Sequence, residues 1–119
     1  VVVVVVVIVF VGGGWVQNDE ANPTAEAVIN QVSEGHDYLE KLFGIRPHIG
    51  WQIDPFGHSS LTPSLWSLMG YDAMVINRIN YLTKKQYKQT KSMEFVWQGE
   101  RTTDDSFLDF FFFNFPSKH

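Results

Sequence analysis

Short apolar runs divide the chain and predict its strands. Residues 49–53, 73–76 and 93–97 are rich in apolar, β-branched and aromatic residues, and each run has the length of a buried strand. Residues 1–11 contain seven consecutive valines and predict a further, fully buried strand. The chain is therefore expected to contain four strands.

Apolar residues at helical spacing predict a long helix between the first two strands. Asn22 is a suitable N-cap, and Pro23 suits the first helical position because its missing N–H would have no partner there. Gly44 is expected to end the helix, and Pro47 supports this end. The apolar side is formed by Val28, Val32, Leu39 and Leu42.

Two further helical segments are predicted after residue 60. Thr62 and Pro63 repeat the pattern of a cap followed by proline, and Gly70 is expected to end this second helix. Residues 84–91 are basic and predict a solvated helix or loop.

Strands that alternate with helices indicate β-α-β units, and hence an α/β fold with a parallel sheet. A complete β/α barrel takes about 250 residues, whereas this chain has 119. The expected fold is a partial arc of such a barrel, with parallel strands alternating with helices. An open arc would leave two strand edges unpaired, which favours aggregation.

Composition narrows the classes of partner. The formal net charge is −4, which argues against nucleic acid or an acidic membrane surface as a partner. There is no cysteine, which excludes disulfides and thiolate metal sites within the chain. The apolar run of residues 1–11 is shorter than the about 20 residues of a spanning helix. No membrane contact is therefore predicted for this segment, and the oligomeric state is not determined.

Candidate chemistry follows the predicted strand at residues 49–53. Asp54 comes at the end of that strand, and Pro55 and Gly57 then turn the chain. Barrel enzymes place catalytic groups at this end of their strands. An aspartate here can also cap a turn or the next helix, and the local pattern leaves both interpretations open.

Three motifs follow one another along the chain. Residues 13–21 read Gly-Gly-Trp-Val-Gln-Asn-Asp-Glu-Ala, and residues 51–59 read Trp-Gln-Ile-Asp-Pro-Phe-Gly-His-Ser. Residues 77–81 read Asn-Arg-Ile-Asn-Tyr, with Glu-Phe-Val-Trp following at residues 94–97. In their order and spacing these motifs resemble the α-mannosidases of glycoside hydrolase family 38, the class II enzymes of lysosomal and Golgi type, and residues 51–59 resemble the nucleophile motif of that family.

The resemblance implies a fold and a division of the chain. The catalytic domain of the family is a seven-stranded β/α barrel, of which this chain would be an arc. Residues 1–99 are then an internal fragment of the N-terminal catalytic barrel, within which residues 1–11 are of low complexity. Residues 100–119 are a divergent low-complexity tail.

The resemblance also implies a zinc-dependent, retaining α-mannosidase that hydrolyses terminal α-mannosyl residues of N-glycans and oligosaccharides. Asp54 is the implied nucleophile and one ligand of a single zinc ion. The other zinc ligands and the acid/base residue are implied to lie outside the chain, so the isolated chain is expected to be inactive. The implied partner is a mannose-containing oligosaccharide, and the implied location is the secretory pathway, in the lysosome or the Golgi.

Arg78 and Tyr81 follow the next strand, and the resemblance implies that both bind substrate. Arg78 is expected beside Asp54, where a guanidinium keeps a carboxylate ionised or binds a sugar hydroxyl. Glu20 is expected to support the start of the helix that follows it, not to act as acid or base. For His58, a structural role in the turn and a direct metal or substrate role both stay open.

Two other functions stay open. One is a non-catalytic sugar-binding or interaction module derived from the same barrel. The other is a different metal-dependent barrel hydrolase, such as a polysaccharide deacetylase, which predicts metal ligands clustered near His58 and no nucleophilic role for Asp54.

Overall fold

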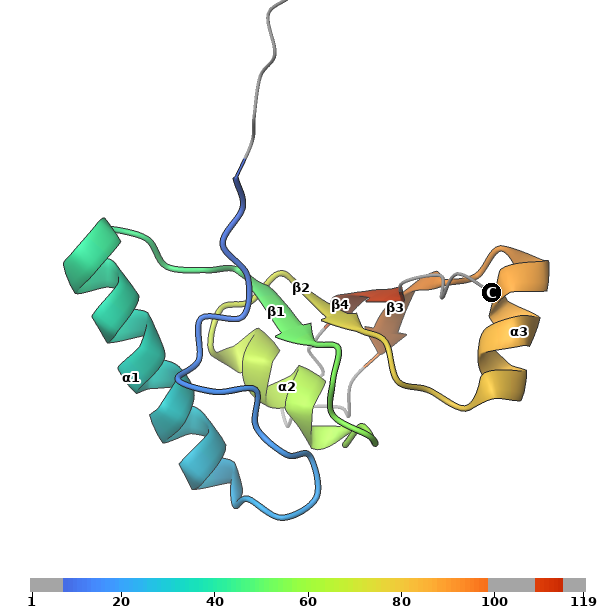
Figure 1. Cartoon of the computed structure of the whole chain (residues 1–119), viewed down its shortest axis with the longest axis horizontal. Helices are drawn as coiled ribbons and strands as arrows, with labels where there is room; N and C mark the ends of the chain where they lie inside the picture. The colour runs from blue at the N-terminus through green and yellow to red at the C-terminus, as the bar shows by residue number, and fades with distance from the viewer. Residues whose placement is uncertain (1–7, 99–108, 115–119) are drawn as a thin grey trace, which may run out of the picture.

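The computed structural model describes residues 8–98 and 109–114 of the chain. The described residues alternate helices with strands, which confirms the α/β class (Figure 1). The elements are α1 (Ala25–Phe43), β1 (Ile49–Gln52), α2 (Leu61–Leu68), β2 (Ala73–Ile76), α3 (Tyr81–Thr90), β3 (Glu94–Gln98) and β4 (Asp109–Asn114).

The four strands form one sheet in the order β1-β2-β4-β3. The strands β1, β2 and β4 are parallel, as expected, whereas β3 pairs antiparallel with β4. The predicted strand at residues 93–97 is thus present, but the expectation of a purely parallel sheet is wrong there. The physical reason is the length of the connection, since ten residues separate Gln98 from Asp109 and a parallel crossover takes about a dozen or more.

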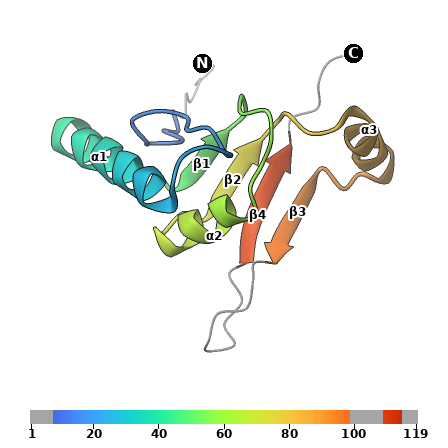
Figure 2. The ribbon, with the colours of Figure 1, turned by 90° about the horizontal axis from the view of Figure 1, so that it is seen from below.

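The helices lie on different sides of this sheet (Figures 1 and 2). α2 lies across one face, α1 lies beside α2 on the β1 side, and α3 lies beyond β3. The rings of Tyr87 and Phe95, with centroids 6.1 Å apart, connect α3 to β3. On the opposite side, the Gly12 N–H donates to the Ile49 carbonyl at 2.8 Å, so the chain before α1 approaches the edge of β1.

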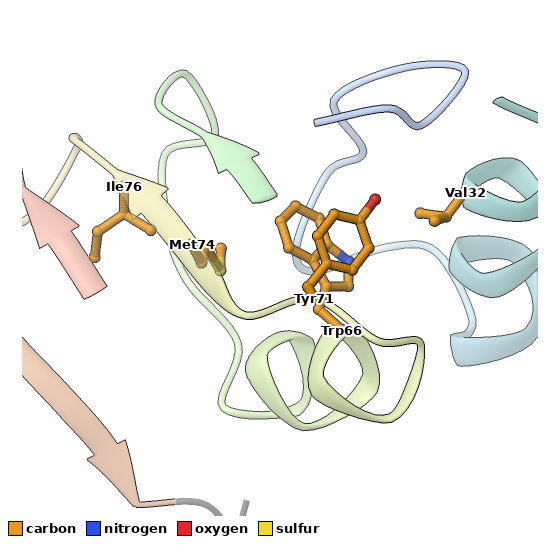
Figure 3. Close-up of a cluster of buried hydrophobic side chains, with 5 residues drawn as sticks. All are labelled: Val32, Trp66, Tyr71, Met74 and Ile76. Atoms are coloured by element: carbon orange, nitrogen blue, oxygen red, sulfur yellow. The ribbon is translucent and has the colours of Figure 1, made fainter. Parts of the chain in front are cut away.

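A small apolar core joins α1, α2 and β2. Figure 3 shows its buried members, which are Val32, Trp66, Tyr71, Met74 and Ile76. The rings of Trp66 and Tyr71 stack with centroids 5.0 Å apart. The Trp66 ring also lies so close to Gly50 that any side chain there would overlap it. This core fixes β1 and β2 relative to each other, and therefore the loops at their carboxyl ends.

The start of α1 differs from the predicted start. The N-cap is Thr24, whose Oγ1 accepts from the Ala27 N–H at 3.2 Å, so Asn22 lies outside the helix. The reason is a local turn, because the Asp19 carboxylate accepts from the Asn22 N–H at 2.8 Å. The predicted end is confirmed, since Gly44 adopts a left-handed φ of 65° and its N–H donates to Glu40.

The starts of α2 and α3 also correct the predictions. α2 begins at Leu61, so Thr62 is not its cap but lies within its first turn. α3 begins at Tyr81 because Asn80 Oδ1 accepts from the N–H groups of the second and third helical residues. Lys84 belongs to this helix and is buried, not solvated.

The predicted strand at residues 1–11 lies partly outside the described residues. Residues 8–11 are described and form no strand, and Ile8 is 77% exposed. An extended segment becomes a strand only by pairing along its length, and this segment approaches β1 through Gly12. No helix in the described ranges has the length and hydropathy that crossing a membrane requires.

Candidate active site

The parallel register of β1 and β2 brings Asp54 and Arg78 together. Gln52 lies opposite Ile76 in this register, and each member of the pair follows its strand by two residues. Arg78 donates to a single oxygen of the carboxylate, with Nε 3.1 Å and Nη2 2.5 Å from Asp54 Oδ1. The structure therefore places Arg78 beside Asp54, where the sequence predicted it.

The Asp54 carboxylate is open to solvent on its other side. The side chain of Asp54 is 72% exposed and that of Arg78 is 55% exposed. Among the described residues, Asp54 Oδ2 has no hydrogen-bond partner. An exposed ion pair adds little to stability, so this arrangement is better suited to meeting a ligand than to holding the fold. The carboxylate borders a hollow of about 230 Å³ whose other lining residues are Gln17, Asn18, Asp19, Pro55 and Phe56.

Tyr81 is positioned separately from this pair. It is the first residue of α3 and is 70% exposed. Within the described ranges its hydroxyl makes no hydrogen bond to Asp54 or Arg78. The structure thus leaves Tyr81 accessible but does not bring it into the ion pair.

Glu20 occupies a different place from the one predicted. Its side chain is 4% exposed, and it does not support the start of α1, which Thr24 caps. Instead Glu20 Oε2 accepts from the Ser59 N–H at 2.9 Å and from the Thr62 hydroxyl at 2.6 Å, at the start of α2. Glu20 Oε1 accepts from the Gln52 amide at 3.2 Å. The prediction failed because these partners lie 32 to 42 residues further along the chain.

This environment keeps Glu20 ionised. Burial by itself raises the pKa of Glu20, but the nearby His58 and the hydrogen bonds from Thr62 and Ser59 outweigh it. The net effect holds the pKa of Glu20 below its ordinary value. The buried carboxylate is therefore a structural anion with its donors already in place.

His58 lies between the buried carboxylate and Arg78, the second residue after β2. Its Nδ1 lies 3.5 Å from Glu20 Oε1, and its Nε2 lies 3.0 Å from the Arg78 carbonyl oxygen. The structural role in the turn is therefore the one the geometry supports. The described residues contain no group of three or more metal-binding side chains, so the clustered ligands that the deacetylase interpretation predicts near His58 are not found there.

Lys84 is a second buried polar residue whose contacts could not be predicted from the sequence. Its Nζ donates to the Asn77 carbonyl at 2.8 Å and to Asn77 Oδ1 at 2.7 Å, immediately before Arg78. Burial lowers the pKa of Lys84. A lysine within a basic run carries no local signal of this role, because the run as a whole is typical of a solvated helix.

Comparison with known proteins places the chain in a family. Residues 5–119 match the model of the glycosyl hydrolases family 38 N-terminal domain. The chain therefore belongs to glycosyl hydrolase family 38, as the three motifs indicated, and the deacetylase interpretation is set aside.

Its relatives are α-mannosidases. The chain is 54% identical to Alpha-mannosidase F of Dictyostelium discoideum over 90 residues, which cover 76% of this chain and 9% of that protein. It is 44% identical to the epididymis-specific alpha-mannosidase of Sus scrofa over 95 residues, 80% of this chain and 10% of that protein. It is 47% identical to Alpha-mannosidase 2 of Mus musculus over 88 residues, 74% of this chain and 8% of that protein. The chain thus spans about a tenth of the length of these relatives.

Proposed function

We propose that the chain is the part of a zinc-dependent, retaining α-mannosidase that carries the catalytic nucleophile, Asp54. The observation that carries the proposal is the Asp54–Arg78 pair at the carboxyl ends of two parallel strands. The carboxylate there is exposed, is oriented through one oxygen and has its other oxygen free. Membership of family 38, in a region shared with α-mannosidases, supports this role.

The proposed chemistry follows from this geometry. In a retaining glycosidase one carboxylate attacks the anomeric carbon and forms a glycosyl-enzyme, while a second carboxyl group about 5–5.5 Å away protonates the leaving oxygen. Asp54 Oδ2 is the proposed attacking atom. Arg78 holds the carboxylate through Oδ1. The second carboxyl group comes from a part of the protein beyond this chain.

The substrate is proposed to be a mannose-containing oligosaccharide, such as an N-glycan. Arg78 and Tyr81 are the proposed substrate-binding residues, since both are exposed and carry donors for sugar hydroxyls. The implied location is the secretory pathway, in the lysosome or the Golgi. The parallel strands β1, β2 and β4 are proposed to be an arc of a seven-stranded barrel, and the division of the chain at residue 99 stays a prediction.

Zinc binding is proposed for the whole protein, with Asp54 as one ligand. A carboxylate oxygen suits a zinc ion, but useful affinity needs several ligands held together. The described residues offer Asp54 without further clustered ligands. Bound zinc would supply a positive charge that orients sugar hydroxyls, and the remaining ligands must come from elsewhere in the protein.

The proposal is tested in the whole protein that contains this chain. Asp54→Asn keeps the shape of the side chain but removes the nucleophile, so release of nitrophenol from a nitrophenyl α-mannoside is expected to stop. Asp72→Asn is the matched control, because Asp72 is exposed and precedes β2 at the opposite end of the sheet. Chelation followed by zinc readdition is expected to abolish and then restore the wild-type activity.

An Asp54→Asn protein with wild-type kcat/KM would contradict the nucleophile, and undiminished activity after metal removal would contradict zinc. A wild-type protein without glycosidase activity would favour the non-catalytic sugar-binding module. The 119-residue chain by itself is expected to be inactive, since acid/base help alone is worth about 10²–10⁴-fold in rate.

A further inference from the structure

We propose that Glu20 and His58 form a positioning pair that sets Arg78, and through it Asp54, for the reaction; this inference rests on the proposed role of Asp54. Glu20 precedes α1, and His58 lies in the turn before α2. Neither side chain contacts the Asp54 carboxylate. Their effect on it passes through the backbone of Arg78.

Glu20 is the fixed end of this arrangement. Its carboxylate accepts from a backbone N–H and a hydroxyl at the start of α2 and from the Gln52 amide at the end of β1. Gln52 is completely buried. A carboxylate that has three donors from two elements and is 4% exposed has one orientation available. It presents Oε1 to the imidazole of His58.

His58 transmits this orientation to Arg78. A carbonyl oxygen only accepts hydrogen bonds, so His58 Nε2 carries the hydrogen that it donates to the Arg78 carbonyl at 3.0 Å. On its other side the ring lies close to Glu20, with Nδ1 3.5 Å from Oε1, although these two atoms make no hydrogen bond. The ring therefore acts as a spacer of fixed length between the turn before α2 and Arg78, the second residue after β2.

The peptide group on the other side of Arg78 is held as well. The Asn77 carbonyl, which belongs to the peptide group before Arg78, accepts from Lys84 Nζ at 2.8 Å. The two peptide groups that flank the Arg78 Cα atom are thus fastened to different elements, one by His58 and one by α3. This leaves the side-chain torsions as the main freedom of Arg78.

Arg78 in turn closes the turn at residues 54–58. Its guanidinium contacts Asp54 at the beginning of this turn, and its carbonyl contacts His58 at the end. A shift of His58 would move the Arg78 backbone and misdirect Nε and Nη2, which meet the same carboxylate oxygen. Because hydrogen-bond strength falls steeply with angle, the orientation of Asp54 depends on a contact made on the far side of Arg78.

Two substitutions at one position separate this role from a purely structural one. His58→Gln extends an amide to about the place of Nε2 and can still donate to the Arg78 carbonyl. His58→Asn places its amide near Nδ1, so it keeps the contact with Glu20 and loses the one with Arg78. Both are made in the whole protein, and kcat and KM are measured with a nitrophenyl α-mannoside alongside the melting temperature.

The expected result is that His58→Gln stays within about threefold of wild-type kcat/KM, whereas His58→Asn loses about tenfold, mainly in kcat, as the removal of one hydrogen bond predicts. Tyr71→Phe is the stability control, since it removes a part-buried hydroxyl that donates to the Gly12 carbonyl and leaves the contacts of Glu20, His58 and Arg78 in place. It is expected to lower the melting temperature with kcat/KM within about twofold of wild type.

Equal kcat/KM for the Gln and Asn variants, or a higher value for Asn, would overturn the positioning role. If the His58→Asn protein does not fold, Glu20→Asp becomes the deciding variant, because it keeps the negative charge but withdraws the carboxylate from His58. Unchanged kcat in that variant would overturn the inference. In either case an inactive Asp54→Asn protein would leave the proposed function intact, which separates the two failures.

Discussion

Glu20 and Asp54 are two carboxylates near the carboxyl end of β1 with opposite surroundings. Glu20 is 4% exposed and accepts hydrogen bonds on both oxygens. Asp54 is 72% exposed and is held through one oxygen by one arginine. Both oxygens of Glu20 are therefore hydrogen-bonded within the protein, whereas Oδ2 of Asp54 is available to a ligand.

The difference supports the proposed division between a residue that holds the site and a residue that reacts. A nucleophile needs an accessible lone pair, which Asp54 has and Glu20 lacks. A positioning group needs the opposite, because only a fully bonded side chain has a fixed direction. Both carboxylates lie in motifs that resemble family 38, so their motifs alone do not distinguish these roles, whereas their surroundings do.

The largest effect short of removing Asp54 is expected at Arg78. Arg78→Met should lower kcat/KM about 10- to 100-fold, because hydrogen bonds to a charged group are worth about 1.5–3 kcal/mol. The melting temperature should change little, since the pair is exposed. Arg46→Met is the control, as Arg46 pairs with Glu40 at 3.4 Å on the surface. Activity of the Arg78 variant within twofold of wild type would show that Asp54 needs no orienting partner.

Glu20 should show the reverse pattern, with stability affected more than rate. Glu20→Gln replaces one carboxylate oxygen with an NH₂ group, which then faces a hydrogen-bond donor instead of accepting from it. The free energy of unfolding should fall by about 2 kcal/mol, the order expected for a buried polar group left unpaired. Glu40→Gln, at a glutamate whose side chain is 58% exposed, should cost at most about 0.5 kcal/mol. Thermal unfolding of both variants provides the comparison. Equal losses would mean that Glu20 is not the structural carboxylate described above.

The stabilising effect of Glu20 should also depend on pH. The pKa of Glu20 lies below its ordinary value of 4.5 in the folded protein, so folding favours the ionised form. Its contribution is fully present above pH 4.5 and is lost as the pH falls through the lowered pKa. The difference in melting temperature between wild type and Glu20→Gln should therefore be widest near neutral pH and close on acidification below 4.5. A difference that widens in acid would contradict the assigned direction.

The smallest effect is expected at Asn80, whose side chain bonds to the start of α3 and to neither Glu20 nor Asp54. Asn80→Ala removes the cap of α3, whose Oδ1 accepts from Leu82 and Thr83, and should cost about 1 kcal/mol. Activity should follow only the loss of stability. A fall in kcat at a temperature where the variant is folded would instead connect the start of α3, and with it Tyr81, to the site.

Local pattern located the elements between residues 25 and 98, but it missed β4, which lies in the predicted tail, and most tertiary contacts. The strand at residues 73–76 and the end of α1 at Gly44 follow from short-range rules, so the sequence alone located them. The placement of Asp54 beside Arg78 also follows, because both residues come shortly after neighbouring parallel strands. The antiparallel direction of β3 depends on a short connection and was missed.

The buried network could not be predicted in the same way. Glu20 finds its partners more than 30 residues away, so the local pattern showed only an acid before a helix. Thr62 has the sequence context of a cap and yet donates to that acid. Lys84 lies in a basic run but is drawn inward by the two oxygens of Asn77. In each case a tertiary contact overrides a correct local preference.

The central claim is that Asp54, and not Glu20, is the reacting carboxylate. The most direct test is to incubate the whole protein with a fluorinated mannosyl substrate that slows hydrolysis of the glycosyl-enzyme, digest it, and locate the sugar by mass spectrometry. The account predicts a mannosyl label on the Asp54 carboxylate, with no label in Asp54→Asn. A label on Glu20, or on any residue other than Asp54, would contradict it.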